Sequence, residues 1–137
     1  MSIAFVVHGI PVGQGSMKSL GPKRIVASNA ATLHPWRSVV AIAASQAMRG
    51  RALLTGPLHV SVDFGFPRPR SHFDSHGDLR PLAPEYRDST PDLDKLLRAL
   101  GDALTGIVWG DDRQVVSITA TKPYVDPPVT TVLVEAA

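Results

Sequence analysis

Residues 91–106 read PDLDKLLRALGDALTG, and this stretch carries the clearest structural signal in the chain. Its leucines recur at i, i+3, i+4, i+7 and i+11, which predicts an amphipathic helix after Pro91. Asp92, or a hydroxyl residue just before it, is expected to cap the start of this helix. Thr105 and Gly106 are suited to end it, because glycine readily adopts the conformation that follows a helix. A helix with one apolar face needs a partner surface, which the neighbouring segments provide.

Segments on both sides of this helix predict a small sheet. Strands are expected over residues 3–8, 24–27, 58–66, 114–122 and 130–135. The segment 58–66 alternates apolar and polar residues, as in a strand buried on one face. A second helix is expected over residues 35–48, since Pro35 suits a first helical turn. These elements predict an α/β fold of the α+β kind.

Length and composition limit the possibilities. The chain has 137 residues, 44% hydrophobic and 19% charged, which is typical of one globular domain over residues 1–137. No apolar run approaches the roughly 20 residues that span a bilayer, and the first residues do not resemble a signal peptide. The absence of cysteine excludes disulfides and thiolate metal sites. We therefore expect a cytoplasmic protein with no membrane partner.

Two long loops are expected, over residues 9–21 and 67–90, because both are rich in glycine or proline. The first lacks the Gly-Lys-Ser/Thr pattern of a phosphate-binding Walker loop. In the second, His72 and His76 have a spacing that would suit two metal ligands on a helix. The nearby prolines argue against a helix, so phosphate contact or solvent exposure is favoured. His59, on the polar side of its strand, is expected at the surface.

Charged residues are unevenly distributed along the chain. Residues 1–62 contain six Lys or Arg and no Asp or Glu, although the net charge of the whole chain is only +2. A basic body that also holds cations suits a nuclease, which must bind a polyanion. A solvated basic face without a ligand is the alternative interpretation.

Four of the 12 acidic residues form two pairs near the predicted helix: Asp92 with Asp94, and Asp111 with Asp112. Clustered carboxylates suit hard cations such as Mg²⁺, which keeps several water ligands and so needs only a few protein oxygens. Taken alone, Gly110-Asp111-Asp112 is ordinary turn sequence. The two pairs together indicate a metal site.

The predicted helix restricts how the first pair can act. Residues two apart in a helix point about 200° from each other, so Asp92 and Asp94 can share an ion only if Asp92 lies at or before the N-cap. Pro91 disfavours helical geometry in the residue before it, which fits a helix start near this point. Arg98, one turn after Asp94, could hold a carboxylate or contact a phosphate. A surface ion-pair ladder that also includes Asp102 is the alternative.

Such carboxylates would support metal-assisted hydrolysis of a phosphodiester, in which Mg²⁺ activates water and neutralises the phosphate. The chain has no Gly-x-Ser-x-Gly, His-Glu-x-x-His or Gly-x-Gly-x-x-Gly motif. Their absence disfavours a serine hydrolase, a zinc protease and a dinucleotide-binding protein. No organic cofactor is expected.

Residues 91–106, together with VWGDDRQV at 108–115, resemble the RusA family of Holliday-junction resolvases, in particular its phage-type members. Further similar segments are GIPVGQGSMK at 9–18, Ser28-Asn29 followed by Trp36-Arg37, and PRPRSH at 67–72. The resemblance therefore covers most of the chain. Its most specific part is the Asp-Leu-Asp helix with the downstream Asp-Asp-x-Gln.

This resemblance implies a small homodimeric endonuclease with a mixed β-sheet packed against two main helices. Such an enzyme requires Mg²⁺ or Mn²⁺ and cuts two strands of a four-way DNA junction symmetrically. Asp92, Asp94 and Asp112 would be the essential metal-site carboxylates, with Asp111 beside them. Arg98 stands where the family often has a catalytic lysine, and arginine keeps the charge but cannot readily exchange a proton. The expected DNA contacts are Lys18, Lys23, Arg24, Arg37, Arg68, Arg70 and His72.

Other functions remain compatible with the sequence. A non-catalytic module would bind branched DNA without cutting it, and Arg98 in place of lysine favours this alternative. A metal-dependent phosphohydrolase of nucleotides or simple duplexes would show no preference for junctions, and the basic N-terminal half argues against it. An ordinary structural α/β domain would do neither.

Overall fold

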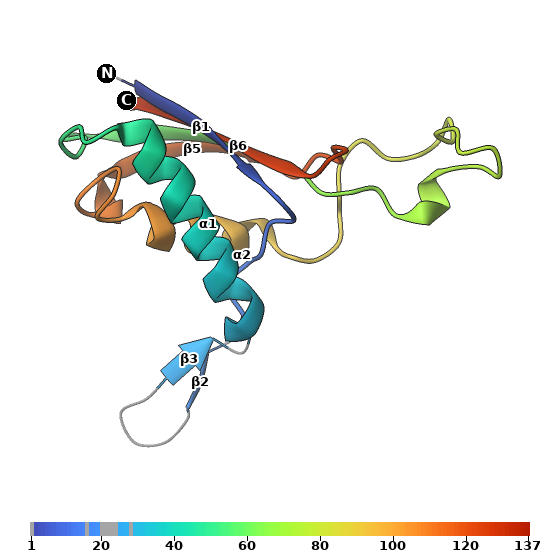
Figure 1. Cartoon of the computed structure of the whole chain (residues 1–137), viewed down its shortest axis with the longest axis horizontal. Helices are drawn as coiled ribbons and strands as arrows, with labels where there is room; N and C mark the ends of the chain where they lie inside the picture. Colours follow the sequence, from blue (N-terminus) through green and yellow to red (C-terminus); the bar gives the residue numbers. More distant parts are fainter. Residues whose placement is uncertain (1, 16, 20–24, 28) are drawn as a thin grey trace.

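The computed structural model describes residues 2–15, 17–19, 25–27 and 29–137, and has a two-layer α+β arrangement (Figure 1). The helices of the described chain are α1 (Ala30–Met48) and α2 (Leu93–Leu104). Its strands are β1 (Ser2–His8), β2 (Met17–Ser19), β3 (Ile25–Ala27), β4 (Leu58–Phe64), β5 (Val115–Thr121) and β6 (Val129–Ala136). Two single-turn 3₁₀ helices, η1 (Arg70–His72) and η2 (Asp112–Gln114), lie in the connections.

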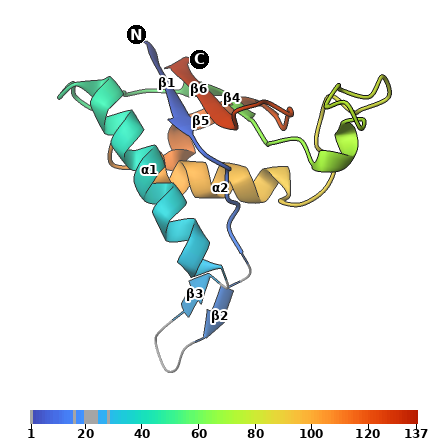
Figure 2. The same ribbon diagram turned by 45° about the vertical axis from the view of Figure 1, so that its right-hand side comes forward.

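The main sheet has the strand order β1-β6-β4-β5. β6 runs antiparallel to both β1 and β4, whereas β5 runs parallel to β4. Parallel neighbours need a crossover connection, and here that connection includes α2. α1 and α2 lie on the same face of the sheet (Figure 2). The expected mixed sheet packed against two helices is therefore confirmed.

The predicted strands are present, with small differences at their ends. One prediction is wrong: residues 17–19, expected in a loop, form β2, which pairs antiparallel with β3. A strand of three residues is too short for hydrophobic periodicity to reveal. The strand predicted from residue 24 is described from Ile25 onward, and Arg24 lies outside the described residues.

The helix after Pro91 is confirmed, whereas the first helix begins earlier than expected. α1 starts at Ala30, because the backbone N–H groups of Thr32 and Leu33 already donate to the carbonyl of Asn29. Pro35 therefore lies inside the helix, where its ring nitrogen cannot donate to the carbonyl one turn earlier. The expectation that Pro35 occupies the first turn is wrong, because the hydrogen bonds to the Asn29 carbonyl begin the helix five residues before Pro35.

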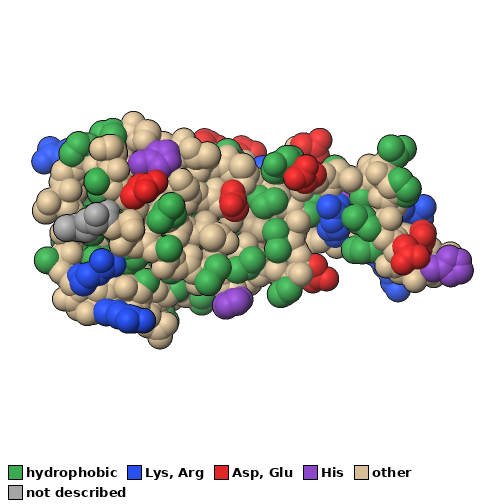
Figure 3. All heavy atoms as spheres, turned by 90° about the horizontal axis from the view of Figure 1, so that it is seen from above, with side chains coloured by type: hydrophobic (Ala, Val, Ile, Leu, Met, Phe, Trp, Pro, Cys, Tyr) green, Lys and Arg blue, Asp and Glu red, His purple; other side chains and the backbone are tan. Residues whose placement is uncertain are grey.

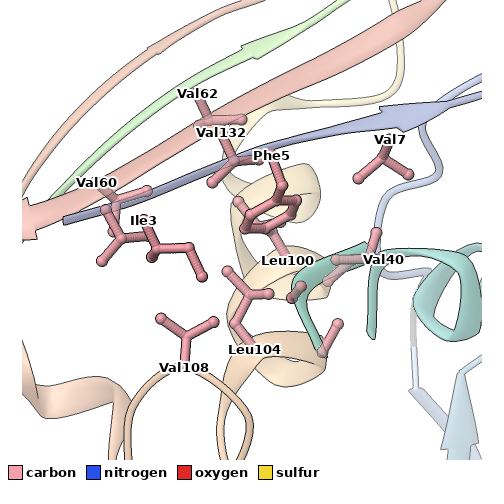
Figure 4. Close-up of a cluster of buried hydrophobic side chains, with 14 of the residues drawn as sticks. Ile3, Phe5, Val7, Val40, Val60, Val62, Leu100, Leu104, Val108 and Val132 are labelled. Atoms are coloured by element: carbon pink, nitrogen blue, oxygen red, sulfur yellow. The ribbon is translucent and has the colours of Figure 1, made fainter. Parts of the chain in front are cut away.

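A single hydrophobic cluster joins the sheet to both helices (Figure 4). The strands contribute alternate residues, and α2 contributes the face that includes Leu96, Leu100 and Leu104. Leu93 and Leu97, also on the predicted apolar face, are only partly buried at the edge of the cluster. The incomplete cover of Leu97 leaves room for a cleft beside α2.

The opposite face of the sheet carries mainly small and polar side chains, together with Val6 and Leu133, and Figure 3 looks onto this side of the molecule. His59 lies there, half-buried, with its ring nitrogens hydrogen bonded to the hydroxyls of Ser117 and Ser61. Antiparallel sheets commonly leave one face to water.

Residues 67–90, which we call the arm, extend away from the two layers (Figure 1). The expectation of a long loop is confirmed apart from η1. The arm is ordered by its own hydrogen bonds: the Asp74 carboxylate accepts from the backbone N–H groups of His76 and Asp78. The backbone N–H of Arg80 donates to the carbonyl of His72.

In the described part of the chain, no helix is long and apolar enough to cross a membrane.

Candidate active site

A cleft of about 480 Å³ lies between α2 and the strands β4 and β5. Its apolar lining is Val60, Leu97, Leu100, Trp109, Val115 and Ile118. Its polar lining includes Asp94, Arg98 and Asp102 from α2, and Asp112 from η2. The cleft therefore brings together three residues that the sequence predicts for the site: Asp94, Arg98 and Asp112.

The cleft exists because β5 is an edge strand that the helices cover only in part. Ile118 points toward the helical layer and is still 48% exposed, whereas Val60 of the neighbouring β4 is buried. Trp109 is a buried part of the lining, and its indole N–H donates to the Thr105 hydroxyl at 3.2 Å. An apolar floor with a few polar groups at its rim is typical of a binding site.

Asp92 is the N-cap residue of α2, with extended backbone angles (φ −66°, ψ 144°). This confirms that Asp92 lies at the cap rather than inside the helix. Its side chain makes no capping hydrogen bond, so the carboxylate remains exposed and without a described partner. It lines a hollow of about 280 Å³ with Lys95 and the loop around Gly13, separate from the cleft that holds Asp94.

The ion-pair ladder along α2 is not formed. Asp102 pairs with Arg37 of α1 at 2.5 Å, and both side chains are partly exposed. Among the described residues, no hydrogen bond or ion pair involves the guanidinium of Arg98. Arg98 is exposed at the rim of the cleft and free to contact an anion.

The two carboxylates of the second pair have different surroundings. Asp111 is the N-cap of η2 and accepts from the backbone N–H of Arg113 at 3.0 Å, in a capping box completed by Gln114. Asp112 follows in the first turn, and its exposed carboxylate has no described partner. Asp111 therefore shapes the turn, while Asp112 presents a free carboxylate to the cleft.

The residues fit a hard divalent cation in their chemistry. Asp92, Asp94 and Asp112 carry carboxylates that no described side chain or backbone group neutralises. Within residues 2–15, 17–19, 25–27 and 29–137, no three carboxylate or imidazole side chains form a ready-made metal cluster. Mg²⁺ is usually held by only one or two carboxylates, with water and substrate phosphate oxygens completing the shell.

Two basic residues, which the sequence did not indicate, hold the segment that leads into Asp92. Lys122, directly after β5, donates from Nζ to the carbonyl oxygens of Ser89 at 2.8 Å and Pro91 at 2.9 Å. Arg87 donates from Nε to the carbonyl of Thr90 at 2.8 Å. The Lys122 contacts join residues more than 30 positions apart, and Arg87 belongs to an arm of irregular structure. Sequence periodicity therefore could not predict either contact.

The predicted DNA contacts have mixed surroundings. Lys23, Arg24 and the side chain of Lys18 lie outside the part of the chain that the structure describes. Arg37 is paired with Asp102. In the view of Figure 3, basic side chains lie mostly toward the two ends of the molecule, one of which is the arm.

Within the arm, Arg68 and His72 both pack on Tyr124. The Arg68 guanidinium lies 5.2 Å from the ring centre and donates to the Pro84 carbonyl at 2.6 Å. His72 meets the same ring edge-on at 4.9 Å. Arg70 is exposed, and its guanidinium has no partner among the described residues. Of the predicted contacts in the arm, Arg70 is therefore the one most available to a phosphate.

Comparison with known proteins identifies the family of the chain. Residues 11–135 match the family model described as endodeoxyribonuclease RusA. A protein of Bacillus subtilis (strain 168), described as uncharacterized protein YqaN, is 30% identical over 141 residues, which cover 96% of this chain and 94% of that protein. The matched range contains the cleft, both acidic pairs and the arm. The chain therefore belongs to the RusA endodeoxyribonuclease family.

Proposed function

We propose that this chain is a Mg²⁺-dependent endodeoxyribonuclease that resolves four-way (Holliday) DNA junctions by paired symmetric nicks, in DNA recombination and repair. Membership of an endodeoxyribonuclease family supports cleavage of DNA. The observation that carries the proposal is the cleft, which is lined by Asp94 and Asp112, whose carboxylates pair with no described residue, and by Arg98, whose guanidinium is likewise unpaired among the described residues. A site with both charges can hold a cation and an anionic phosphate at once.

Asp92, Asp94 and Asp112 would hold Mg²⁺, for which Mn²⁺ is expected to substitute. When bound, a divalent cation lowers the pKa of a water ligand and neutralises charge on the phosphate. Asp111, predicted as a further ligand, contributes mainly by fixing the turn that presents Asp112. Ionised carboxylates accept hydrogen bonds and do not donate them. The same carboxylates would therefore also orient water molecules at the cleft by accepting hydrogen bonds from them.

Arg98 is the proposed catalytic contact to the phosphate. Its planar guanidinium can donate two parallel hydrogen bonds to phosphate oxygens, and these strengthen as negative charge develops on the phosphate. Arginine remains protonated at neutral pH, so Arg98 stabilises charge and transfers no proton.

Binding of a four-way junction is proposed to involve a homodimer, acting in the cytosol of a bacterium or of a phage-infected cell. A junction has two-fold symmetry, and a C2 dimer presents two equal sites to two equivalent strands. The arm, with Arg70 exposed, would contact the DNA backbone outside the cleft. Such phosphate contacts orient DNA without reading its sequence.

The test compares nicking of a synthetic four-way junction with nicking of a linear duplex of the same sequence, with and without Mg²⁺. We expect paired nicks in the junction that require the metal and disappear in Asp94→Asn and Asp112→Asn. Junction binding without cleavage in any divalent metal would instead indicate a non-catalytic binding module. Equal turnover of duplex or nucleotides would indicate a phosphohydrolase with other substrates.

A further inference from the structure

Lys122 lies at a junction of three segments on the helical side of the sheet edge. It directly follows β5, and its carbonyl accepts from the backbone N–H of Arg87 at 2.8 Å where the arm returns. Its Nζ reaches the carbonyls of Ser89 and Pro91, immediately before the start of α2. One side chain therefore links the end of β5 to the beginning of the helix that carries Asp92 and Asp94.

Lys122 differs from an ordinary surface lysine in its burial and in its hydrogen bonds. Lys122 is half-buried, and two of its three ammonium donors are used on backbone carbonyls. Hydrogen bonds from a charged donor are roughly twice as strong as neutral ones. Arg87 binds the carbonyl between these two, so three successive carbonyls before Asp92 each accept a bond from a cation.

This restraint matters because the Asp92 side chain has no hydrogen bond to any described residue, although the Asp92 carbonyl accepts from the backbone N–H of Leu96 at 3.1 Å. The Asp92 carboxylate makes no capping bond, so only the backbone determines where it lies. If the segment 89–91 moved, Asp92 and the first turn of α2 with Asp94 would move with it. We propose that Lys122 is a positioning residue, which holds the start of α2 so that Asp92 and Asp94 can bind the divalent cation; this role rests on the proposed function above.

If Lys122 acted only through its charge, its removal would change the metal affinity in the opposite direction from the one expected for a positioning residue. Removing a positive charge near a cation site strengthens cation binding by Coulomb's law. Removing a group that orients metal ligands weakens binding, by about 10- to 100-fold where such groups have been replaced. The direction of the change in metal affinity in Lys122→Met therefore separates the two effects.

The experiment measures Mn²⁺ binding to the full chain by isothermal titration calorimetry, with electron paramagnetic resonance of free Mn²⁺ as a second readout. We expect Lys122→Met to bind Mn²⁺ about 10-fold more weakly or worse, and Lys122→Arg to recover most of the affinity. Lys95→Met is the matched control, because Lys95 lies beside Asp92 but its ammonium bonds to none of these carbonyls. This control should bind Mn²⁺ as tightly as the original chain or more tightly.

Unchanged or tighter Mn²⁺ binding by Lys122→Met would overturn the positioning role. If Lys122→Met does not fold, Lys122→Gln takes its place under the same criterion. Asp92→Asn separates this proposal from the one it rests on. If Asp92→Asn weakens Mn²⁺ binding and Lys122→Met does not, only the positioning role fails. If Asp92→Asn has no effect, the assignment of Asp92 as a ligand fails, and the role of Lys122 with it.

Discussion

Replacing Gln114 with alanine is expected to lower the free energy of unfolding by about 2–3 kcal/mol. Its side-chain Oε1 accepts from the backbone N–H groups of Gly110 and Asp111, both at 3.1 Å. Its Nε2 donates to the carbonyls of Leu54 at 3.0 Å and Gly56 at 3.1 Å. Each such bond contributes about 0.5–1.5 kcal/mol net, and water can replace part of the exposed ones.

These four hydrogen bonds join the turn that carries Asp112 to the segment at residues 54–56, so activity should fall together with stability. The assay is urea unfolding followed by circular dichroism, alongside junction cleavage at a temperature where the variant is folded. Arg113→Ala is the control from the same turn, because its side chain is 86% exposed and its contact with Asp111, at 3.4 Å, contributes little. A Gln114→Ala variant within about 0.5 kcal/mol of the original chain would refute the reasoning.

Three further outcomes are expected. Gly65→Ala should cost about 2 kcal/mol or more in thermal unfolding, because its Cβ would lie 2.3 Å from the carbonyl oxygen of Val129. Arg98→Ala should lower the single-turnover cleavage rate by about 10²–10³, and Arg98→Lys by much less; equal rates would contradict the phosphate contact. In urea unfolding, Asp111→Ala should lower the free energy of unfolding by about 1 kcal/mol, and Asp92→Ala by less than half of that, because the Asp92 side chain makes no capping bond. A larger loss in Asp92→Ala than in Asp111→Ala would contradict this difference in capping.

The sequence predicts α2 well because its signals are local. The leucine spacing, Pro91 and Gly106 all act within a few turns of one helix. Asp92 was one of the local candidates for the cap, and helix geometry required it to lie at or before the cap if it shares an ion with Asp94. The missing capping bond could not be predicted, because whether a side chain bonds to its own helix depends on the loop packed beside it.

The surroundings of the cleft were harder to predict, because they depend on contacts between distant segments. The i, i+4 rule favoured a pair between Arg98 and Asp102, yet Asp102 bonds to Arg37, 65 positions away on α1. Because α1 packs against α2, Asp102 pairs with Arg37 instead of with Arg98, and the Arg98 guanidinium is left without a described partner. Likewise, Arg68 and His72 read as phosphate contacts in the sequence, but Tyr124 returns beside the arm and engages both.

The position of the polar groups in the topology bears on the kind of substrate. β4 and β5 are the parallel pair of the sheet, and the arm and α2 both belong to their connection. Asp112 lies just before β5 and Lys122, which holds the segment leading to Asp92, just after it. Asp94, Arg98 and Asp112 line the cleft, whereas Arg70 lies outside it on the arm. A mononucleotide in the cleft is too small to reach the arm as well, whereas a DNA strand can contact both. Weak competition by mononucleotides against junction DNA is therefore the behaviour that this arrangement favours.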